Sequence, residues 1–235
     1  MSNDSRVFLI AVAGGSGSGK STVVDALSAR LGPERCIIVH EDAYYWPMAH
    51  YGAAETDAQR AALAAQVDYD DPAAKDVGRL VRDLAALKRG EVVDIPVYDY
   101  ARHDRSDACR RIEPRPVLVF EGIHALSLPE LRPLLDLSIY VDTPDDLRLA
   151  RRLRRDVVER QRDVEGVLNQ YLASVRPAHY RHTYPAKFSA DLVIADEGLP
   201  AYGDIVPSEA AIERMLAPIL ERLSRAGLNV TRGLA

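Results

Sequence analysis

The sequence predicts an α/β fold with a parallel sheet flanked by helices, and three observations support this prediction. A short apolar run at residues 6–13 directly precedes a glycine-rich loop at 13–22. An amphipathic stretch with helical spacing follows at 21–31. Further short apolar runs lie at 36–40, 116–122, 137–142 and 191–195. Because helical stretches recur between these runs, we expect five parallel strands.

The glycine-rich loop fits the P-loop pattern of Gly, four residues, Gly, Lys and Ser or Thr. Glycines allow a turn with positive φ that points successive N–H groups inward, and the next helix adds its positive dipole end. Lys20 is expected to reach the β- and γ-phosphates, and the Ser21 hydroxyl to hold Mg²⁺. We therefore expect a nucleoside triphosphate or a similar anion to bind the loop residues Gly14, Gly15, Ser16, Gly17, Ser18, Gly19, Lys20, Ser21 and Thr22.

Length and composition are compatible with a single domain over residues 1–235. The chain has 30 Lys plus Arg and 35 Asp plus Glu, a net charge of −5, which argues against an extended nucleic-acid surface. Cys36 and Cys109 form no CxxC motif, so we expect neither a disulfide framework nor a zinc site. The polar start and the absence of a long apolar run predict a cytoplasmic protein without a membrane span.

Acidic residues lie at or just after the carboxyl ends of three of the predicted strands, where open parallel sheets bind their ligands. Asp42 follows the strand at 36–40 and begins a loop with three aromatic residues. These aromatics either form a wall for a flat ligand or belong to the core, in which case Asp42 caps a helix. Glu121 ends the strand at 116–122, where P-loop enzymes keep the second carboxylate of the Mg²⁺ site. Asp142, at the end of 137–142, is expected to be structural.

Between these strands the pattern predicts a helix and a hairpin. The acidic turn at 68–72 opens a helix at 73–89, and most acids in such a turn only cap. Residues 92–100 and 108–112 can pair as a hairpin, with Tyr98, Tyr100 and His103 near its tip.

Arginines are concentrated in a helix that starts near residue 145. Leu149, Leu153 and Val157 have the spacing of a core face. The arginines could form a nucleic-acid patch, a solvated face laced with acids, or a lid over transferring phosphates. Because a P-loop is present, a phosphate lid is favoured relative to a nucleic-acid patch. The arginines lie on a different face of the helix from the apolar residues, and they are Arg148, Arg152, Arg155 and Arg162. A last amphipathic helix is expected near 208–225.

The ordered set of motifs resembles the uridine kinase family, which comprises nucleoside 5′-phosphotransferases with the P-loop kinase fold. The resemblance extends from about residue 7 to 195 and implies a hairpin subdomain at 91–115, lid helices at about 148–170 and a homo-oligomer, and the amphipathic pattern adds a C-terminal helix within 207–227. The segments that carry it are 13–21, 41–45, 69–72, 96–105, 120–123, 141–144, 151–156, 159–163, 169–171, 175–177 and 190–194.

The resemblance also implies roles for individual residues. Asp42 matches the acid that contacts the acceptor 5′-hydroxyl as general base or orienter, close to the Mg²⁺ of Ser21 and Glu121, and is itself a candidate ligand. Asp70 matches the carboxylate that accepts from the ribose hydroxyls. Around the nucleoside the resemblance places Tyr45, Tyr69, Tyr98, His103, Arg152, Arg162 and Gln170. It places Arg155 on ATP, and Lys20, Arg160 and Arg162 with the transferring phosphate.

Some positions depart from the family pattern. Asp71 stands where the family usually has His, and Lys75 where an apolar residue is usual, which suggests an extra acid and an extra base beside the sugar. The stretch 46–67 is longer than is usual in the family, and 195–198 is acidic where a basic turn is usual, so adenine contacts stay unassigned.

The expected function is transfer of the γ-phosphoryl group of ATP or GTP to the 5′-hydroxyl of uridine or cytidine, with Mg²⁺, in pyrimidine salvage. One alternative is a kinase of another small hydroxyl acceptor, such as a sugar phosphate or pantothenate. The other is a P-loop switch or assembly ATPase that binds a macromolecule through its arginine helix. Asp42 and Asp70 beside aromatics favour a small acceptor.

Overall fold

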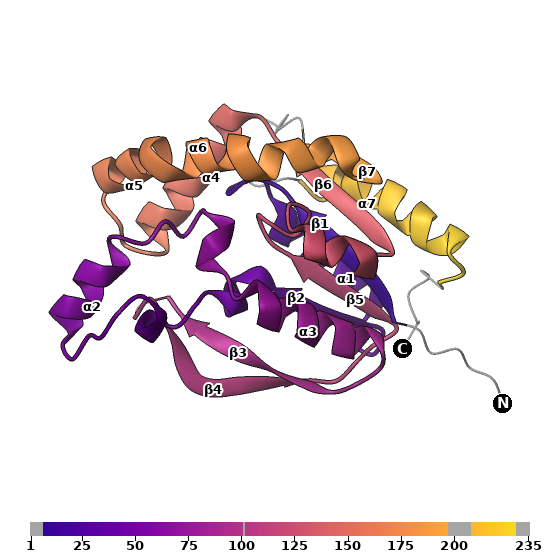
Figure 1. Cartoon of the computed structure of the whole chain (residues 1–235). Coiled ribbons are helices and arrows are strands. Elements are labelled where there is room, and N and C mark those ends of the chain that lie inside the picture. Colours follow the sequence, from indigo (N-terminus) through magenta and orange to yellow (C-terminus); the bar gives the residue numbers. More distant parts are fainter. Residues whose placement is uncertain (1–6, 101, 197–207, 229–235) are drawn as a thin grey trace.

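The computed structural model describes residues 7–100, 102–196 and 208–228. Within them, a parallel five-stranded sheet has the order β2-β5-β1-β6-β7, which confirms the predicted fold class (Figure 1). In the register, β5 lies between β2 and β1, so that His40 is the partner of Glu121. The strands are β1 (Phe8–Ala13), β2 (Cys36–His40), β5 (Val117–Glu121), β6 (Leu137–Asp142) and β7 (Leu192–Ala195).

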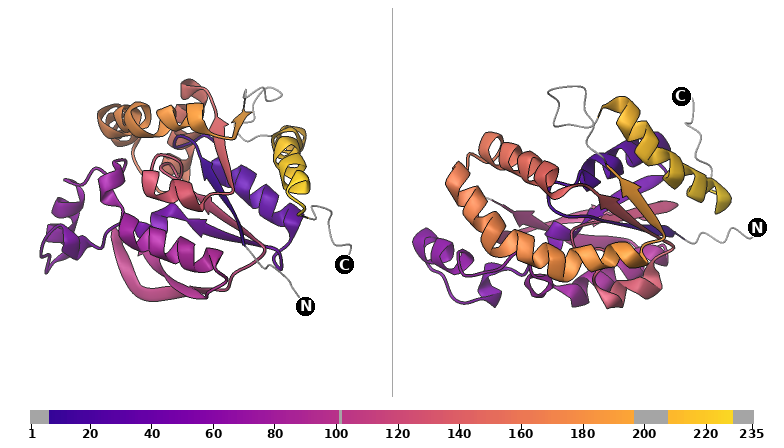
Figure 2. Two further views of the ribbon diagram at one scale, coloured as in Figure 1. Left: turned by 45° about the vertical axis from the view of Figure 1, so that its right-hand side comes forward. Right: turned by 90° about the horizontal axis from the view of Figure 1, so that it is seen from above.

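Helices cover both faces of the sheet (Figure 2). Successive β1 side chains enter opposite cores: Leu9 and Ala11 face one, and Ile10 and Val12 face the other. Strands buried on both faces read as continuous apolar runs, which is why the sequence located them. One core is covered by α1 (Lys20–Leu31) and α7 (Glu209–Arg225), and the other by α3 (Val77–Lys88).

A two-stranded antiparallel hairpin, β3 (Val93–Asp99) and β4 (Asp104–Ile112), packs its base against α3 through Ile95 and Ile112. The predicted return strand at 108–112 was too short, because β4 begins four residues earlier. Residues 104–107 are polar and therefore lack the apolar alternation that marks a strand. The longer ladder brings His103, with a φ of 50°, to the tip of the hairpin.

The helix predicted at 73–89 was also too long at its start. Residues 72–74 form a 3₁₀ turn, and α3 begins at Val77 with Asp76 as its N-cap, accepting from the Arg79 N–H. Lys75 between them is extended because its backbone pairs with Tyr45. In the long stretch 46–67, α2 (Asp57–Ala64) starts with a capping box of Thr56 and Gln59.

The arginine-rich segment forms α4 (Asp145–Val158) and α5 (Val164–Gln170), which lie over the sheet edge (Figure 1). The interpretation of a solvated arginine face is wrong for Arg148 and Arg152, because they are only 2% and 7% exposed. The fully buried Asp156 lies on the same face. The run continues through π-helical turns at 171–175 and 179–183, α6 (Arg176–Ala178) and a 3₁₀ turn at 184–189.

Among the described residues, no helix combines the length and apolar character needed to cross a bilayer. Parts of three sequence predictions lie outside the described residues: the strand start at residue 6, the helix boundary at 207, and the acidic segment beyond 196.

His179, in the turn that follows α6, lies against the P-loop, since a Cβ added at Gly15 would be 3.0 Å from its Cε1. Burial, helped by the charge of Arg148, lowers the pKa of this imidazole from 6.5 to about 4. Between these two values the unfolded chain binds a proton that the folded protein does not bind. The folded state therefore loses stability as pH falls through this window.

We expect His179→Gln to remove that pH dependence. Between about pH 7.5 and about pH 5 the Tm of the wild type should fall by about 5 °C more than that of the variant. Differential scanning calorimetry at both pH values measures this difference. Equal falls in Tm would contradict a buried neutral imidazole.

Candidate active site

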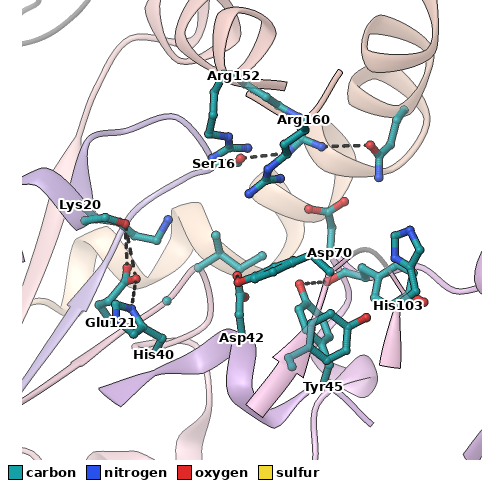
Figure 3. A pocket seen from close by; sticks show the side chains of 18 of the residues that line it. Ser16, Lys20, His40, Asp42, Tyr45, Asp70, His103, Glu121, Arg152 and Arg160 are labelled. Carbon is teal, nitrogen blue, oxygen red and sulfur yellow. Dashed lines mark hydrogen bonds and ion pairs between the residues drawn. The ribbon is translucent and has the colours of Figure 1, made fainter. Parts of the chain in front are cut away.

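A cleft of about 500 Å³ opens at the carboxyl ends of β2 and β5, and most of the predicted site residues line it (Figure 3). Lys20 and Glu121 lie at one end, Asp70 and His103 at the other, and Arg152 and Arg160 extend over it. The full lining is Ser16, Lys20, Ser21, His40, Asp42, Tyr45, Tyr69, Asp70, Tyr98, Tyr100, His103, Glu121, Gly122, Ile123, Arg152, Arg155, Arg160, Arg162 and Gln170.

A second cavity of about 360 Å³ lies on the outer side of the P-loop. It shares Lys20, Ser21 and Arg155 with the cleft, so the two spaces meet at the phosphate-binding groups. Gly19 is the N-cap of α1 with a φ of 83°, a conformation that favours glycine. Gly17, Gly19 and Thr22 line this second cavity, whereas Gly14, Gly15 and Ser18 line neither of the two cavities.

Two of the three predicted metal-binding groups, Ser21 and Glu121, meet at the end of β5, whereas the third, Asp42, lines the same cleft. The Ser21 hydroxyl lies 3.4 Å from each carboxylate oxygen of Glu121, and His40 Nδ1 lies 2.8 Å from Glu121 Oε1. This hydrogen bond raises the pKa of His40. Burial alone would raise the pKa of Glu121, but His40 and Lys20 outweigh it and lower that pKa. A hydroxyl and an ionised carboxylate are hard oxygen donors that fit Mg²⁺.

Asp42 lies in a 3₁₀ turn (Glu41–Tyr44) directly after β2. Lys75 Nζ donates to its Oδ1 at 3.2 Å, and the Tyr100 hydroxyl donates to its Oδ2 at 2.8 Å. Desolvation in the cleft raises the pKa of Asp42, but Lys75, Tyr100 and Lys20 outweigh it and lower the pKa to about 2. The carboxylate is therefore ionised at neutral pH and is a weak base.

Asp70 lies at the far end of the cleft, where its Oδ2 accepts from the Ser174 hydroxyl at 3.1 Å. Burial raises the pKa of Asp70, and the nearby Arg152 opposes this rise. His103 stands beside Tyr69, and burial, helped by Arg162, lowers its pKa, so the ring is neutral at pH 7.

The tyrosines form a wall beside Asp70. The centroid of the Tyr45 ring lies 5.3 Å from that of Tyr69 and 5.0 Å from that of Tyr98. The Tyr45 hydroxyl donates to the Tyr69 carbonyl oxygen. Burial is the main cause that raises the pKa of these three phenols. They therefore stay neutral and offer an aromatic surface to a flat ligand.

The lid arginines are gathered around one carboxylate. Asp156 is 0% exposed and lies within 2.9 to 3.6 Å of guanidinium nitrogens of Arg152, Arg155, Arg160 and Arg162. Arg152 donates to Ser16 Oγ at 2.8 Å and to Gln170 Oε1 at 3.1 Å, and Arg162 donates to the same Gln170 oxygen at 2.7 Å. Several cations are thereby held above the P-loop.

Comparison with known proteins shows the family to which the chain belongs. The sequence model described as "Phosphoribulokinase / Uridine kinase family" matches residues 9–199. The chain belongs to this family. It is 44% identical to a uridine kinase of Chloroflexus aurantiacus over 81% of this chain and 88% of that protein. It is 39% identical to a uridine kinase of Lactococcus lactis subsp. cremoris over 88% of this chain and 97% of that protein.

A solved structure of phosphoribulokinase from Rhodobacter spheroides shares the fold, with a TM-score of 0.57 and 18% identity over 88% of this chain and 78% of that one. The resemblance to the uridine kinase family and the prediction of a kinase are thus confirmed. The sequence places this chain among the P-loop kinases of the phosphoribulokinase/uridine kinase family, and the roles of individual residues stay predictions.

Some members of the site were missed at the sequence level. His40, Tyr100 and Asp156 were not assigned roles, although Tyr100 and Asp156 lie within segments that carry the family resemblance and His40 directly precedes one. Asp71 does not line the cleft: its Oδ1 caps Ala73, and its Oδ2 faces His182 at 3.7 Å. The lining of the cleft therefore gives no support to the expectation of an extra acid beside the sugar.

Proposed function

We propose that this kinase transfers the γ-phosphoryl group of ATP to the 5′-hydroxyl of a pyrimidine nucleoside and serves pyrimidine salvage. The observation that carries the proposal is the cleft itself, which has Lys20 and Ser21 at one end and Asp70 and the tyrosine wall at the other. Asp42 lines the same cleft. The uridine kinase names of the relatives support the same acceptor.

In this proposal the chain acts by positioning and electrostatics. Lys20 and the P-loop amides hold the phosphates, and Asp42 accepts a hydrogen bond from the acceptor hydroxyl. A carboxylate with a pKa of about 2 is too weak a base to remove the proton early, so Asp42 orients the hydroxyl. In a loose phosphoryl-transfer transition state the nucleophile needs little early deprotonation.

Ser21 and Glu121 would hold Mg²⁺, which when bound neutralises charge on the phosphates. Arg152, Arg155 and Arg160 extend from α4 and the turn after it into the cleft lining, where they can pair with the oxygens of the transferring group. The second cavity, lined by P-loop residues and α4, would receive the rest of the donor nucleotide. GTP as a donor, a cytoplasmic location and a homo-oligomer also belong to this proposal.

An acceptor panel tests the proposal. The purified chain is incubated with ATP, Mg²⁺ and uridine, cytidine, adenosine, a pentose phosphate or pantothenate, and ADP release is measured. We expect uridine or cytidine to give the highest kcat/KM, with a nucleoside monophosphate as the product. A sugar phosphate or pantothenate that is turned over faster than either pyrimidine nucleoside would overturn the proposal.

We expect Asp70→Ala to weaken acceptor binding selectively. Removing a charged hydrogen-bond acceptor from the ribose hydroxyls costs about 1.5–3 kcal/mol, so the KM for uridine should rise about 10- to 100-fold. The KM for ATP should stay within about threefold. Ser174→Ala is the control, because it removes only the hydroxyl that donates to Asp70 and leaves the Asp70 carboxylate in place. An unchanged KM for uridine in Asp70→Ala would remove Asp70 from the ribose site.

A further inference from the structure

Lys75 is a buried lysine beneath the acceptor end of the cleft, and it does not line the cleft itself. None of its side chain is exposed. A buried ammonium group is costly unless it is paired, so its partners indicate why it is there. Its Nζ lies 3.2 Å from Asp42 Oδ1, 3.4 Å from Glu41 Oε1 and 3.1 Å from the centroid of the Tyr45 ring.

The backbone holds Lys75 at this place. Tyr45 and Lys75 form an isolated antiparallel bridge, and hydrogen bonds of 3.0 and 2.7 Å connect residues 44–46 with 74–76. The 3₁₀ turn at 72–74 and the start of α3 lie on either side of this bridge. The main chain therefore fixes where the Lys75 side chain starts, and the contacts of its ammonium group with Asp42, Glu41 and Tyr45 hold its far end.

Glu41, the second partner, is fixed to the end of β5. Its Oε2 accepts from the His124 N–H at 2.8 Å. A Cβ added at Gly122 would be 1.8 Å from that same oxygen, so this position requires glycine for space. Lys75 thus links two carboxylates. One is Asp42, on the acceptor side, and the other is Glu41, which packs against Gly122 at the end of β5.

Tyr100 holds the other oxygen of Asp42, at 2.8 Å, from the hairpin. Among the residues that the structure describes, each carboxylate oxygen of Asp42 then has one donor. Because each oxygen can accept two hydrogen bonds, one position per oxygen is left for an acceptor hydroxyl. The two donors come from separate elements and so determine the plane of the carboxylate.

We propose that Lys75 and Tyr100 are positioning residues that fix the Asp42 carboxylate for the acceptor hydroxyl during phosphoryl transfer. The inference rests on the proposed role of Asp42 and adds two residues that act through it. Lys75 also lies on the face of Tyr45, and so couples the carboxylate to the aromatic wall. A misplacement of about 1 Å at a reacting group can cost about 100-fold in rate.

The test measures kcat and both KM values for Lys75→Met and Tyr100→Phe, with the acceptor that the wild type uses best. We expect kcat to fall about 100-fold for Lys75→Met and about 10-fold for Tyr100→Phe. The KM for ATP should stay within about threefold in both variants. Lys88→Met is the matched control, because Lys88 pairs with Asp136 at the opposite edge of the sheet and should keep kcat.

Lys75→Met also leaves Glu41 without its cation, which could unfold the protein, so a second variant separates folding from positioning. Glu41→Gln with Lys75→Met removes both charges and leaves Asp42 without its ammonium partner. If Lys75 positions the Asp42 carboxylate, this double variant folds with the wild-type circular dichroism spectrum and has the same low kcat as Lys75→Met. A double variant with wild-type kcat would overturn the proposal.

Two other results would also overturn it: a kcat within about threefold of the wild type in Tyr100→Phe, or an ATP KM that rises as much as kcat falls. Failure of the proposed function is recognised separately. If the wild type prefers a sugar phosphate, the nucleoside assignment fails, whereas the ratio of kcat between variant and wild type on that acceptor still tests Lys75 and Tyr100.

Discussion

Asp42→Asn is expected to lower kcat by about 1,000-fold while ATP still binds with near wild-type affinity. The amide keeps the shape of the carboxylate but loses the charge that holds Lys75 and orients the hydroxyl. Its NH₂ group would also face either the Lys75 ammonium or the Tyr100 hydroxyl. Steady-state kinetics with uridine, together with calorimetric titration of a nonhydrolysable ATP analogue, measures both quantities.

Asp142→Asn is the control for this prediction. Asp142 ends the parallel strand β6, as Asp42 follows the end of β2, and it pairs with Lys187 at 2.6 Å. It does not line the cleft. We expect its kcat to stay within about twofold of the wild type. Near-normal turnover in Asp42→Asn would exclude the proposed role of Asp42.

Asp156→Asn is expected to disrupt the lid. Its carboxylate is the shared partner of four arginines and is completely buried, so the neutral amide leaves several guanidinium groups without compensation. Breaking buried ion pairs by removing one partner costs about 3–5 kcal/mol. Because Arg152 and Arg162 would lose their orientation over the P-loop, kcat should also fall about 100-fold.

Chemical denaturation and steady-state kinetics of Asp156→Asn measure the two effects. Asp146→Asn is the control, because it makes the same change on an exposed residue in the first turn of α4. We expect it to change neither the free energy of unfolding nor kcat by much. If Asp156→Asn kept both the wild-type stability and the wild-type kcat, the lid would not depend on a shared carboxylate.

The parallel strands were predictable because burial on both faces leaves a direct pattern in the sequence. Residues 36–40 and 137–142 are strands with the predicted bounds. The P-loop was equally clear, because its pattern directly reflects the backbone geometry that phosphate binding requires. The position of Asp42 and Glu121 in one cleft was predictable because the carboxyl ends of parallel strands gather at one edge of a sheet.

The orientation of α4 could not be predicted from its sequence. Leu149 and Leu153 have the spacing of a core face, yet Arg148 and Arg152 are the buried residues. An arginine can be buried only where partners for its charge exist, and here these are Asp145 and Asp156. Such partners become visible only once the helix is placed over the P-loop.

Lys75 and Asp71 show the same limit in the acceptor site. Both departed from the family pattern, and the sequence suggested that both stand beside the sugar. In the structure, Asp71 faces away toward His182, whereas Lys75 lies under Asp42. The difference arises from the extended backbone at Lys75, which pairs with Tyr45 and which no local propensity indicates.

The position of β5 between β2 and β1 has a consequence for how this enzyme can diversify. The chain leaves the sheet at the carboxyl end of β2, at His40, and returns at the amino end of the neighbouring parallel strand β5, at Val117. The excursion between them contains Asp42, Asp70, Tyr98 and His103, whereas the P-loop and α4 lie outside it. In the proposed function, most side chains assigned to the acceptor therefore belong to one continuous stretch of chain between two neighbouring strands, and a change of acceptor is expected to involve this stretch before the P-loop or α4.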